Sequence, residues 1–338
     1  MKYDVLFRLD AGEGIGLGHL RRCLALADAF KAKGIKRIAF ATRTDKVLEY
    51  WLKKKFPIFK ISSGTLNDEL GEWRSLACVH EIAIAIVDRY DITVDFLAGI
   101  KTHIPTVLCI DDTARLDFYP VDGVINHNPY AKALKYRTNP EARLFLGTEY
   151  ALIGEEFLAY RYKKNMRKKD RTKFFVSLGG FGAAESCFLK IERALQKLNG
   201  KIETFWARGS AQETAREMAS SDLALSGSGI TSYELAFLGI PTALVILGDS
   251  QEKTAETLGR KKIVKNLGWL EKLSSEQIGQ KLMELMNNKR ERQMMGKRAR
   301  TLIDGKGAFR LANALIKTYL ARKSGQRMRR VHDLRTTS

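Results

Sequence analysis

The sequence has few of the residues that build metal sites and disulfide frameworks. It contains four cysteines and five histidines among 338 residues, and no two cysteines form a Cys-x-x-Cys pair. Structural zinc sites need closely spaced ligand pairs, and disulfide scaffolds are typical of short, cysteine-rich chains. We therefore expect reduced cysteines within the core, no metal ion and no cofactor.

Long hydrophobic runs are missing as well. No uncharged apolar stretch reaches the about 18 residues that a membrane-spanning helix needs. The N-terminal sequence MKYDVLFRLD carries charges where a signal peptide has an apolar core. The sequence therefore predicts a cytoplasmic protein.

Acidic residues are too few to balance the basic ones. The chain has 58 Lys and Arg against 38 Asp and Glu, a formal net charge of +20. Much of this excess lies in residues 161–173 and 322–338, and neither run alternates with aromatic side chains or shows a helix-turn-helix or zinc-finger pattern. We expect no specific nucleic-acid partner. The runs are typical of a solvated linker and a frayed tail, with weak association to an acidic membrane surface as the alternative.

Chain length and the alternation of strand-like and helical runs predict two α/β domains. The strand-like runs are DVLFRLD, KRIAFAT, IAIAIVD, TVLCID, DGVIN and ARLFLG in the first half, and TKFFVSLGG, KIETFWARG, DLALSGSG and TALVILGD in the second. Helical spacing of apolar residues separates several of them, as in HLRRCLALADAFKAKG. This order is typical of parallel sheets that are covered by helices on both faces.

The basic run divides the two patterns. We predict a first Rossmann-like domain over residues 1–157, a basic linker over 158–172, a second Rossmann-like domain over 173–321 and a disordered basic tail over 322–338. Four helical stretches are expected between about residues 274 and 321. The last of them could pack back on the first domain.

A glycine-rich turn precedes the first predicted helix. Four glycines between residues 12 and 18 allow a ligand to approach the backbone and direct helix N–H groups at anionic oxygens. The turn does not fit the Gly-x-Gly-x-x-Gly pattern, and Arg43 stands where a dinucleotide site has an acidic ribose ligand. No Gly-Lys-Ser or Gly-Lys-Thr follows. The pattern therefore disfavours NAD and ATP.

His19 begins the helix after this turn and is our candidate base. It is predicted at the carboxyl edge of the sheet, where open α/β folds bind ligands. The positive end of the helix disfavours protonation of the imidazole, which leaves it able to accept a proton. The alternative is a histidine that only hydrogen-bonds the glycine turn.

Aspartates end three of the predicted strands. Asp10, Asp88 and the pair Asp111–Asp112 are expected at one rim of the sheet, where carboxylates can bind sugar hydroxyls. Capping a helix or a turn is an equal alternative for each of them. Their spacing forms no compact metal site.

The second half has three small-residue loops after strands. Residues 226–234, SGSGITSYE, open a helix whose N–H groups suit a pyrophosphate. Thr231 and Glu234 also match a capping box, which any helix could use. The loops Ser177–Gly180 and Gly248–Gln251 follow neighbouring strands. Three such loops around one rim favour nucleotide binding.

The motifs FRLDAGEGIGLGHLRRCLALADAF, CIDD, GTEYALIGEEF, SLGG and SGSGITSYELAFLGIP occur in this order. They resemble the UDP-2,4-diacetamido-2,4,6-trideoxy-β-L-altropyranose hydrolases of pseudaminic acid biosynthesis, and their relatives in spore-coat polysaccharide synthesis. The resemblance spans about residues 3–315. It implies a GT-B architecture, in which two Rossmann-like domains face each other across a cleft. UDP would lie on the C-terminal domain and the sugar on the N-terminal domain.

The resemblance also implies roles for individual residues. His19 would activate a water that attacks the anomeric carbon and expels UDP with inversion. Glu234 would hold the ribose hydroxyls, and residues 229–231 would face the phosphates. The implied contacts are Asp10, Gly16, Gly18, Arg22, Asp88 and Asp111 for the sugar, and Gly179, Gly180, Ser228, Gly229, Ile230, Thr231, Glu234, Asp249 and Gln251 for the nucleotide.

The chain departs from the family pattern in several places. Gly154 stands where relatives carry an arginine, Ser250 where they carry an asparagine, and Phe181-Gly182 where Ser-Asp is usual. The stretch 206–222 is short and is expected to lack a strand and loop that help to seat the uracil. These departures leave three hypotheses: hydrolysis of a UDP-sugar, a GT-B glycosyltransferase of surface or spore-coat polysaccharide synthesis, and a sugar-binding protein without turnover.

Overall fold

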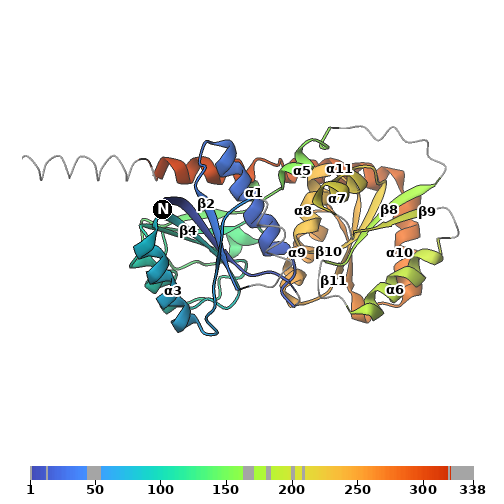
Figure 1. The fold of residues 1–338 in the computed structure, drawn as a ribbon. Helices are drawn as coiled ribbons and strands as arrows, with labels where there is room; N and C mark the ends of the chain where they lie inside the picture. Colours follow the sequence, from blue (N-terminus) through green and yellow to red (C-terminus); the bar gives the residue numbers. More distant parts are fainter. Residues whose placement is uncertain are drawn as a thin grey trace, which may run out of the picture.

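Two α/β domains, each built on a parallel sheet, form the protein (Figure 1). The structure is a computed structural model that describes residues 2–12, 14–43, 55–162, 171–179, 184–198, 202–207, 210–318 and 320. Part of the predicted linker and the whole predicted tail lie outside these residues. In the described part of the chain, no helix has the length and apolar character needed to cross a bilayer.

The N-terminal sheet has seven parallel strands in the order β3-β2-β1-β4-β5-β6-β7. They are β1 (Lys2–Leu9), β2 (Ile38–Thr42), β3 (Ile58–Lys60), β4 (Glu81–Asp88), β5 (Thr106–Ile110), β6 (Gly123–Asn126) and β7 (Arg143–Leu146). Six of these strands were predicted. The three-residue β3 was not, because so short an edge strand shows no period of its own.

Helices cover both faces of this sheet, as expected for strands that are apolar on both sides. They are α1 (Gly18–Ala32), α3 (Leu66–Val79) and α4 (Val94–Lys101), with 3-10 turns η1 (Ala131–Ala133) and η2 (Thr148–Tyr150). The short helix α5 (Glu155–Leu158) follows in the chain and packs with the C-terminal domain, where Phe157 joins a core (Figure 1). Phe7 and Phe30 belong to a core on the α1 face. Leu6, Trp73 and Phe96 belong to a second core on the α3 and α4 face.

The C-terminal sheet has five parallel strands in the order β12-β11-β10-β8-β9. They are β8 (Thr172–Ser177), β9 (Ile202–Trp206), β10 (Leu223–Gly227), β11 (Thr242–Ile246) and β12 (Lys265–Trp269). Its helices are α6 (Glu185–Gln196), α7 (Ala211–Ala219), α8 (Ile230–Leu238), α9 (Asp249–Arg260), α10 (Ser275–Asn287) and α11 (Lys289–Leu302), with η3 (Leu270–Lys272). Between β9 and β10 the described residues contain α7 and no strand, as the short segment suggested.

The prediction of four helices after residue 274 was wrong, because three occur in the described residues 274–318. The helix α11 continues through Gly296, where a β-carbon would collide with the carbonyl oxygen of Gly239. The third helix, residues 307–318, returns to the N-terminal domain and is the red helix above it in Figure 1. Leu311 and Leu315 join the core on the α1 face.

The start of this returning helix is expected to be sensitive to added volume. A β-carbon at Gly307 would collide with the backbone of Tyr150 and Ala151. We expect Gly307→Ala to destabilise the protein by about 2 kcal/mol in urea unfolding, because neither backbone segment can give way. The control is Gly71→Ala inside α3, where the space is open and a gain of about 0.5–1 kcal/mol is expected. Equal changes in the free energy of unfolding for the two substitutions would show that Gly307 does not pack tightly against the backbone of Tyr150 and Ala151.

Candidate active site

A cavity of ≈ 790 Å³ lies between the two domains. Its walls come from the glycine turn and the first turns of α1, from the segments that follow β4, β5 and β6, and from the loops after β8, β10 and β11. These loops are at the carboxyl ends of parallel strands, where α/β folds bind ligands. Helices α1, α8 and α9 lie at the junction of the domains in Figure 1.

His19 is the second residue of α1, lines the cavity and is 4% exposed. Its Nδ1 lies 2.6 Å from Oδ1 of Asp88, the last residue of β4. An ionised carboxylate only accepts hydrogen bonds, so Nδ1 carries the proton and donates a hydrogen bond to Asp88. The other ring nitrogen, Nε2, is then the proton acceptor. The arrangement has the form of a base that is oriented by a buried carboxylate.

Asp88 is fully buried behind His19 and is held by several donors. Arg22 donates from Nε to Oδ2 at 2.7 Å and from Nη2 to Oδ1 at 2.5 Å, and the Cys23 thiol lies 3.4 Å from Oδ2. Burial raises the pKa of Asp88, but Arg22 and His19 outweigh it, so the pKa lies well below its ordinary value. Asp88 is therefore ionised. It is not part of the cavity wall, and its predicted contact with the sugar stays a prediction.

The structure brings Asp112 rather than Asp111 to the cavity. Arg22 donates from Nη1 to both carboxylate oxygens of Asp112, at 2.9 and 3.1 Å. The Asp111 carboxylate instead accepts from the backbone N–H groups of Thr113 and Ala114, at 2.8 and 2.6 Å. Asp111 thus has the turn-capping geometry that was its alternative interpretation.

Asp10 also lies away from the cavity wall. It accepts from Arg8 Nη1 at 2.7 Å and from the Arg43 backbone N–H at 2.8 Å. Arg8 also binds the buried Glu69 through two hydrogen bonds, and Arg89 binds the same carboxylate at 2.6 Å. This ion network ties α3 to the ends of β1 and β4. The predicted contact of Asp10 with a substrate stays untested.

Tyr90 is a cavity residue that the sequence reasoning missed. Its half-exposed ring packs edge-on against the His19 imidazole, with ring centres 4.7 Å apart. Partial burial and the Asp112 carboxylate raise the pKa of Tyr90 to about 12, so the phenol is protonated at neutral pH. His127, Asn128 and Tyr233 were missed too. All but Tyr233 follow the carboxyl ends of strands, which is the signal that could have found them.

The C-terminal wall of the cavity is formed by small-residue loops. Gly229 is the N-cap of α8, and a β-carbon built on it would meet no atom within 4 Å. In the described part of the chain no side chain caps α8, so the N–H groups at its start face this open space, which suits an anion. The capping box of Thr231 and Glu234 is not formed, because the helix begins at Ile230 and has no side-chain cap. Other predicted nucleotide contacts on the wall are Gly179, Ser228, Ile230, Thr231 and Gln251.

Gln251 connects two of these loops. Its Oε1 accepts from the backbone N–H of Ser228 at 3.0 Å and of Leu247 at 3.3 Å. Asp249 starts α9 without reaching the wall, whereas Ser250 lines it. Gly180, together with residues 181–183, lies outside the described residues.

Gly16, Gly18 and Arg22, predicted to contact the sugar, all line the cavity. Gly154 lines it as well, and the Glu156 carboxylate occupies the space beside it: a β-carbon on Gly154 would lie 2.5 Å from Glu156 Oε2. An arginine at this position, as in the related family, would require Glu156 to move.

Glu234 joins the domains instead of lining the cavity. It accepts a hydrogen bond from Arg21 of α1 at 3.2 Å and is 2% exposed. A second link between the domains is Asn128, whose Oδ1 accepts from Tyr233 Oη at 2.6 Å and from Thr254 Oγ1 at 3.3 Å. The predicted binding of ribose by Glu234 would require the Arg21 contact to open.

Glu234 is expected to make stability depend on pH. Burial raises its pKa from 4.5 to about 7, with Arg21 opposing and Glu156 adding to the effect. The contribution of Glu234 to the free energy of unfolding is therefore fully present below about pH 4.5. Up to about 3 kcal/mol of it is lost as the pH rises through 7. We expect Glu234→Gln to abolish this loss, so that the free energy of unfolding in urea, wild type minus variant, falls by up to about 3 kcal/mol between pH 5 and pH 8. A variant whose pH profile matches the wild type would contradict this prediction.

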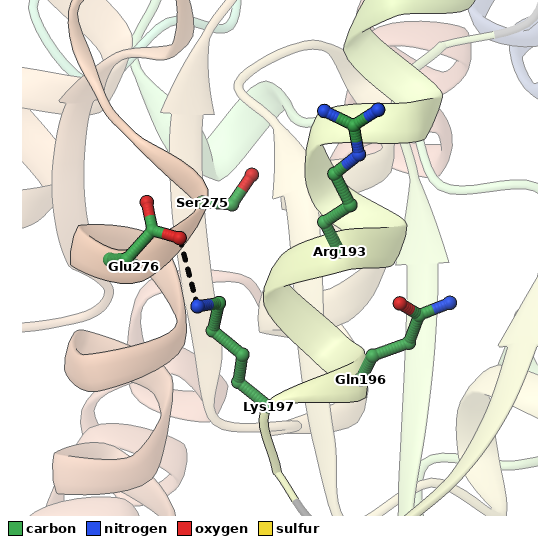
Figure 2. A pocket seen from close by; sticks show the side chains of 5 residues that line it. All are labelled: Arg193, Gln196, Lys197, Ser275 and Glu276. Atoms are coloured by element: carbon green, nitrogen blue, oxygen red, sulfur yellow. Dashed lines mark ion pairs between the residues drawn. The ribbon is translucent and has the colours of Figure 1, made fainter.

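A second hollow of ≈ 550 Å³ lies between α6 and α10 (Figure 2). Its side chains are Arg193, Gln196, Lys197, Ser275 and Glu276. Lys197 and Glu276 form an ion pair there at 2.8 Å. No residue predicted to be functional lies in this hollow, so the interdomain cavity is the candidate active site.

Two Rossmann-like domains with a cavity at the carboxyl ends of both sheets define a GT-B fold. The structure of Acinetobacter baumannii MurG matches with a TM-score of 0.67 and 14% identity, over 93% of this chain and 99% of that one. The UDP co-structure of S. aureus MnaA matches with a TM-score of 0.61 and 12% identity, over 95% and 97%. The predicted fold is therefore confirmed.

Sequence comparison identifies distant relatives, whereas no protein-family model matches. The UDP-2,4-diacetamido-2,4,6-trideoxy-β-L-altropyranose hydrolase of Campylobacter jejuni is 30% identical over 179 residues, covering 52% of this chain and 60% of the hydrolase. The spore coat polysaccharide biosynthesis protein SpsG of Bacillus subtilis is 23% identical over 339 residues, covering 92% of this chain and 97% of SpsG. The chain is a distant relative of both.

Proposed function

We propose that this protein hydrolyses a UDP-linked 2,4-diacetamido-2,4,6-trideoxy sugar to the free sugar and UDP. The observation that carries the proposal is the His19–Asp88 pair, which faces a cavity that also contains the open N-terminus of α8. The name of the C. jejuni relative states this hydrolysis, and the name of SpsG states a role in spore coat polysaccharide biosynthesis. MnaA and LpCGTa, which share the fold, were solved with UDP.

In the proposed reaction, His19 acts as the general base. Its Nε2 takes a proton from water while the water oxygen bonds to the anomeric carbon. The bond from that carbon to the phosphate oxygen breaks, and its electron pair leaves with UDP. Attack from the side opposite UDP inverts the anomeric centre. The N–H groups of residues 229–231 would stabilise the charge on the departing phosphate, so no acid catalyst or metal ion is required.

A GT-B glycosyltransferase is the second candidate. Ile15 is 48% exposed and Tyr90 is 52% exposed, both line the cavity, and Tyr90 contacts the His19 ring. Such an apolar edge would suit an acceptor sugar or lipid that replaces the water. The basic runs would then favour a membrane surface.

The test measures UDP release from a panel of UDP-linked amino sugars without acceptor and in the presence of EDTA. We expect release from the 2,4-diacetamido substrate at the same rate with and without EDTA. Release only after addition of an acceptor would support the transferase, and UDP binding without release would support a binding protein. Dependence of the rate on added divalent metal would contradict the proposed mechanism.

A further inference from the structure

His127 is a second histidine of the cavity. It follows β6 directly, lines the cavity wall and is 3% exposed. Its ring packs edge-on against Tyr233 of the C-terminal domain, with centres 5.0 Å apart and planes at 89°. The ring is thus held where the two domains meet.

A ring nitrogen of His127 lacks a hydrogen bond within the described residues, whereas the side-chain amides of the two neighbouring asparagines are hydrogen-bonded. Its Nδ1 is buried and has no hydrogen-bond partner in the described part of the chain. Asn126 Nδ2 donates to Tyr136, and Asn128 Nδ2 donates to Asp112 at 2.8 Å. A buried polar atom without a partner costs about 1–3 kcal/mol, and a molecule bound in the cavity can offset this cost once the His127 ring turns Nδ1 toward it.

The charge state of His127 limits the kind of partner. Burial lowers its pKa to about 4, and Arg22 acts in the same direction, although Asp112 and Asp88 oppose them. The imidazole is therefore neutral at neutral pH, with one donor and one acceptor nitrogen. His19 differs because Asp88 orients its ring. Among the residues that the structure describes, no carboxylate is hydrogen-bonded to the His127 ring, so His127 lacks the arrangement of a base.

We propose that His127 is a sugar-contact residue that determines specificity, by hydrogen-bonding a hydroxyl or acetamido group of the bound nucleotide sugar. A neutral donor and acceptor pair suits an uncharged polar substituent better than a phosphate or carboxylate. This inference rests on the proposed function, because it requires a sugar on the N-terminal side of the cavity.

The test compares His127→Phe with His127→Gln. Phenylalanine keeps the edge-on contact with Tyr233 and removes both nitrogens, whereas glutamine keeps a donor and an acceptor. Calorimetric titration would compare these variants with their parent in a His19→Ala background, so that the sugar nucleotide is not hydrolysed, and would use UDP alone and the UDP-linked 2,4-diacetamido sugar. We expect His127→Phe to weaken binding of the UDP-sugar about 10-fold and leave UDP binding unchanged. His127→Gln should recover most of the loss, and in turnover KM should rise with little change in kcat.

The outcomes separate this inference from the proposed function. The inference is wrong if His127→Phe binds the UDP-sugar as its parent does, or if it loses affinity for UDP and the UDP-sugar equally, which would indicate a structural role. His103→Gln, at an exposed histidine outside the cavity, should leave both affinities unchanged. A wild type that releases no UDP from the UDP-sugar would overturn the proposed function itself, whatever the titrations show.

Discussion

Replacing His19 by alanine is expected to lower kcat for UDP release about 1,000-fold, because the water loses its general base. The affinity for UDP should stay within about 3-fold of the wild type, since the predicted phosphate contacts come from the C-terminal domain. Single-turnover UDP release and calorimetric titration with UDP measure the two quantities separately. The result expected for a base is therefore a loss in kcat without a comparable loss of binding.

The control for this prediction is His103→Ala, which removes an exposed histidine away from the cavity. It should leave kcat unchanged. A His19→Ala variant that still releases UDP at more than about a tenth of the wild-type rate would exclude His19 as the base.

Asp88→Asn is expected to lower kcat by about 1,000- to 10,000-fold, although the side chain never touches the cavity. Asparagine can donate to Nδ1 of His19, so the proton of the neutral imidazole would move to Nε2 and the ring could no longer accept a proton from water. The same substitution leaves Arg22 with Asp112 as its remaining charged partner, so a loss of about 2–4 kcal/mol in stability should accompany it. Activity is therefore measured at a temperature where circular dichroism shows the variant folded.

Cys23→Ala provides a matched control, because it removes a contact to Asp88 Oδ2 without touching the His19–Asp88 bond. Its kcat should stay within about 3-fold of the wild type. The double variant with His19→Ala and Asp88→Asn should be no slower than His19→Ala alone, since the two residues act as one unit. Additive losses would contradict the proposed pairing.

Most strands and the first helix could be predicted because their signals are local. β1, β4 and β5 are apolar runs that end in polar residues, and α1 has helical spacing after a glycine turn. The edge strand β3 and the strand β12 were missed. β12, KNLGW, contains a glycine and few β-branched residues, so tertiary pairing with β11 rather than propensity makes it a strand.

The candidate site could be predicted only in part. The rule that strand ends meet at one rim led to Asp10, Asp88 and Asp111, and all three lie at that rim. The rule says nothing about the direction of a side chain. Asp10 turns to Arg8, Asp111 caps its own turn, and the neighbouring Asp112 faces the cavity.

The sequence by itself determined that the chain forms two Rossmann-like domains and that His19 begins a helix after a glycine turn, because these features depend on residues close together in the chain. The tertiary structure decided that Asp88, 69 residues away, orients His19, and that Glu234 meets Arg21 across 213 residues. It also decided that Tyr90 and His127 line the cavity. Such pairings depend on strand order, domain packing and burial, which no local pattern of residues records.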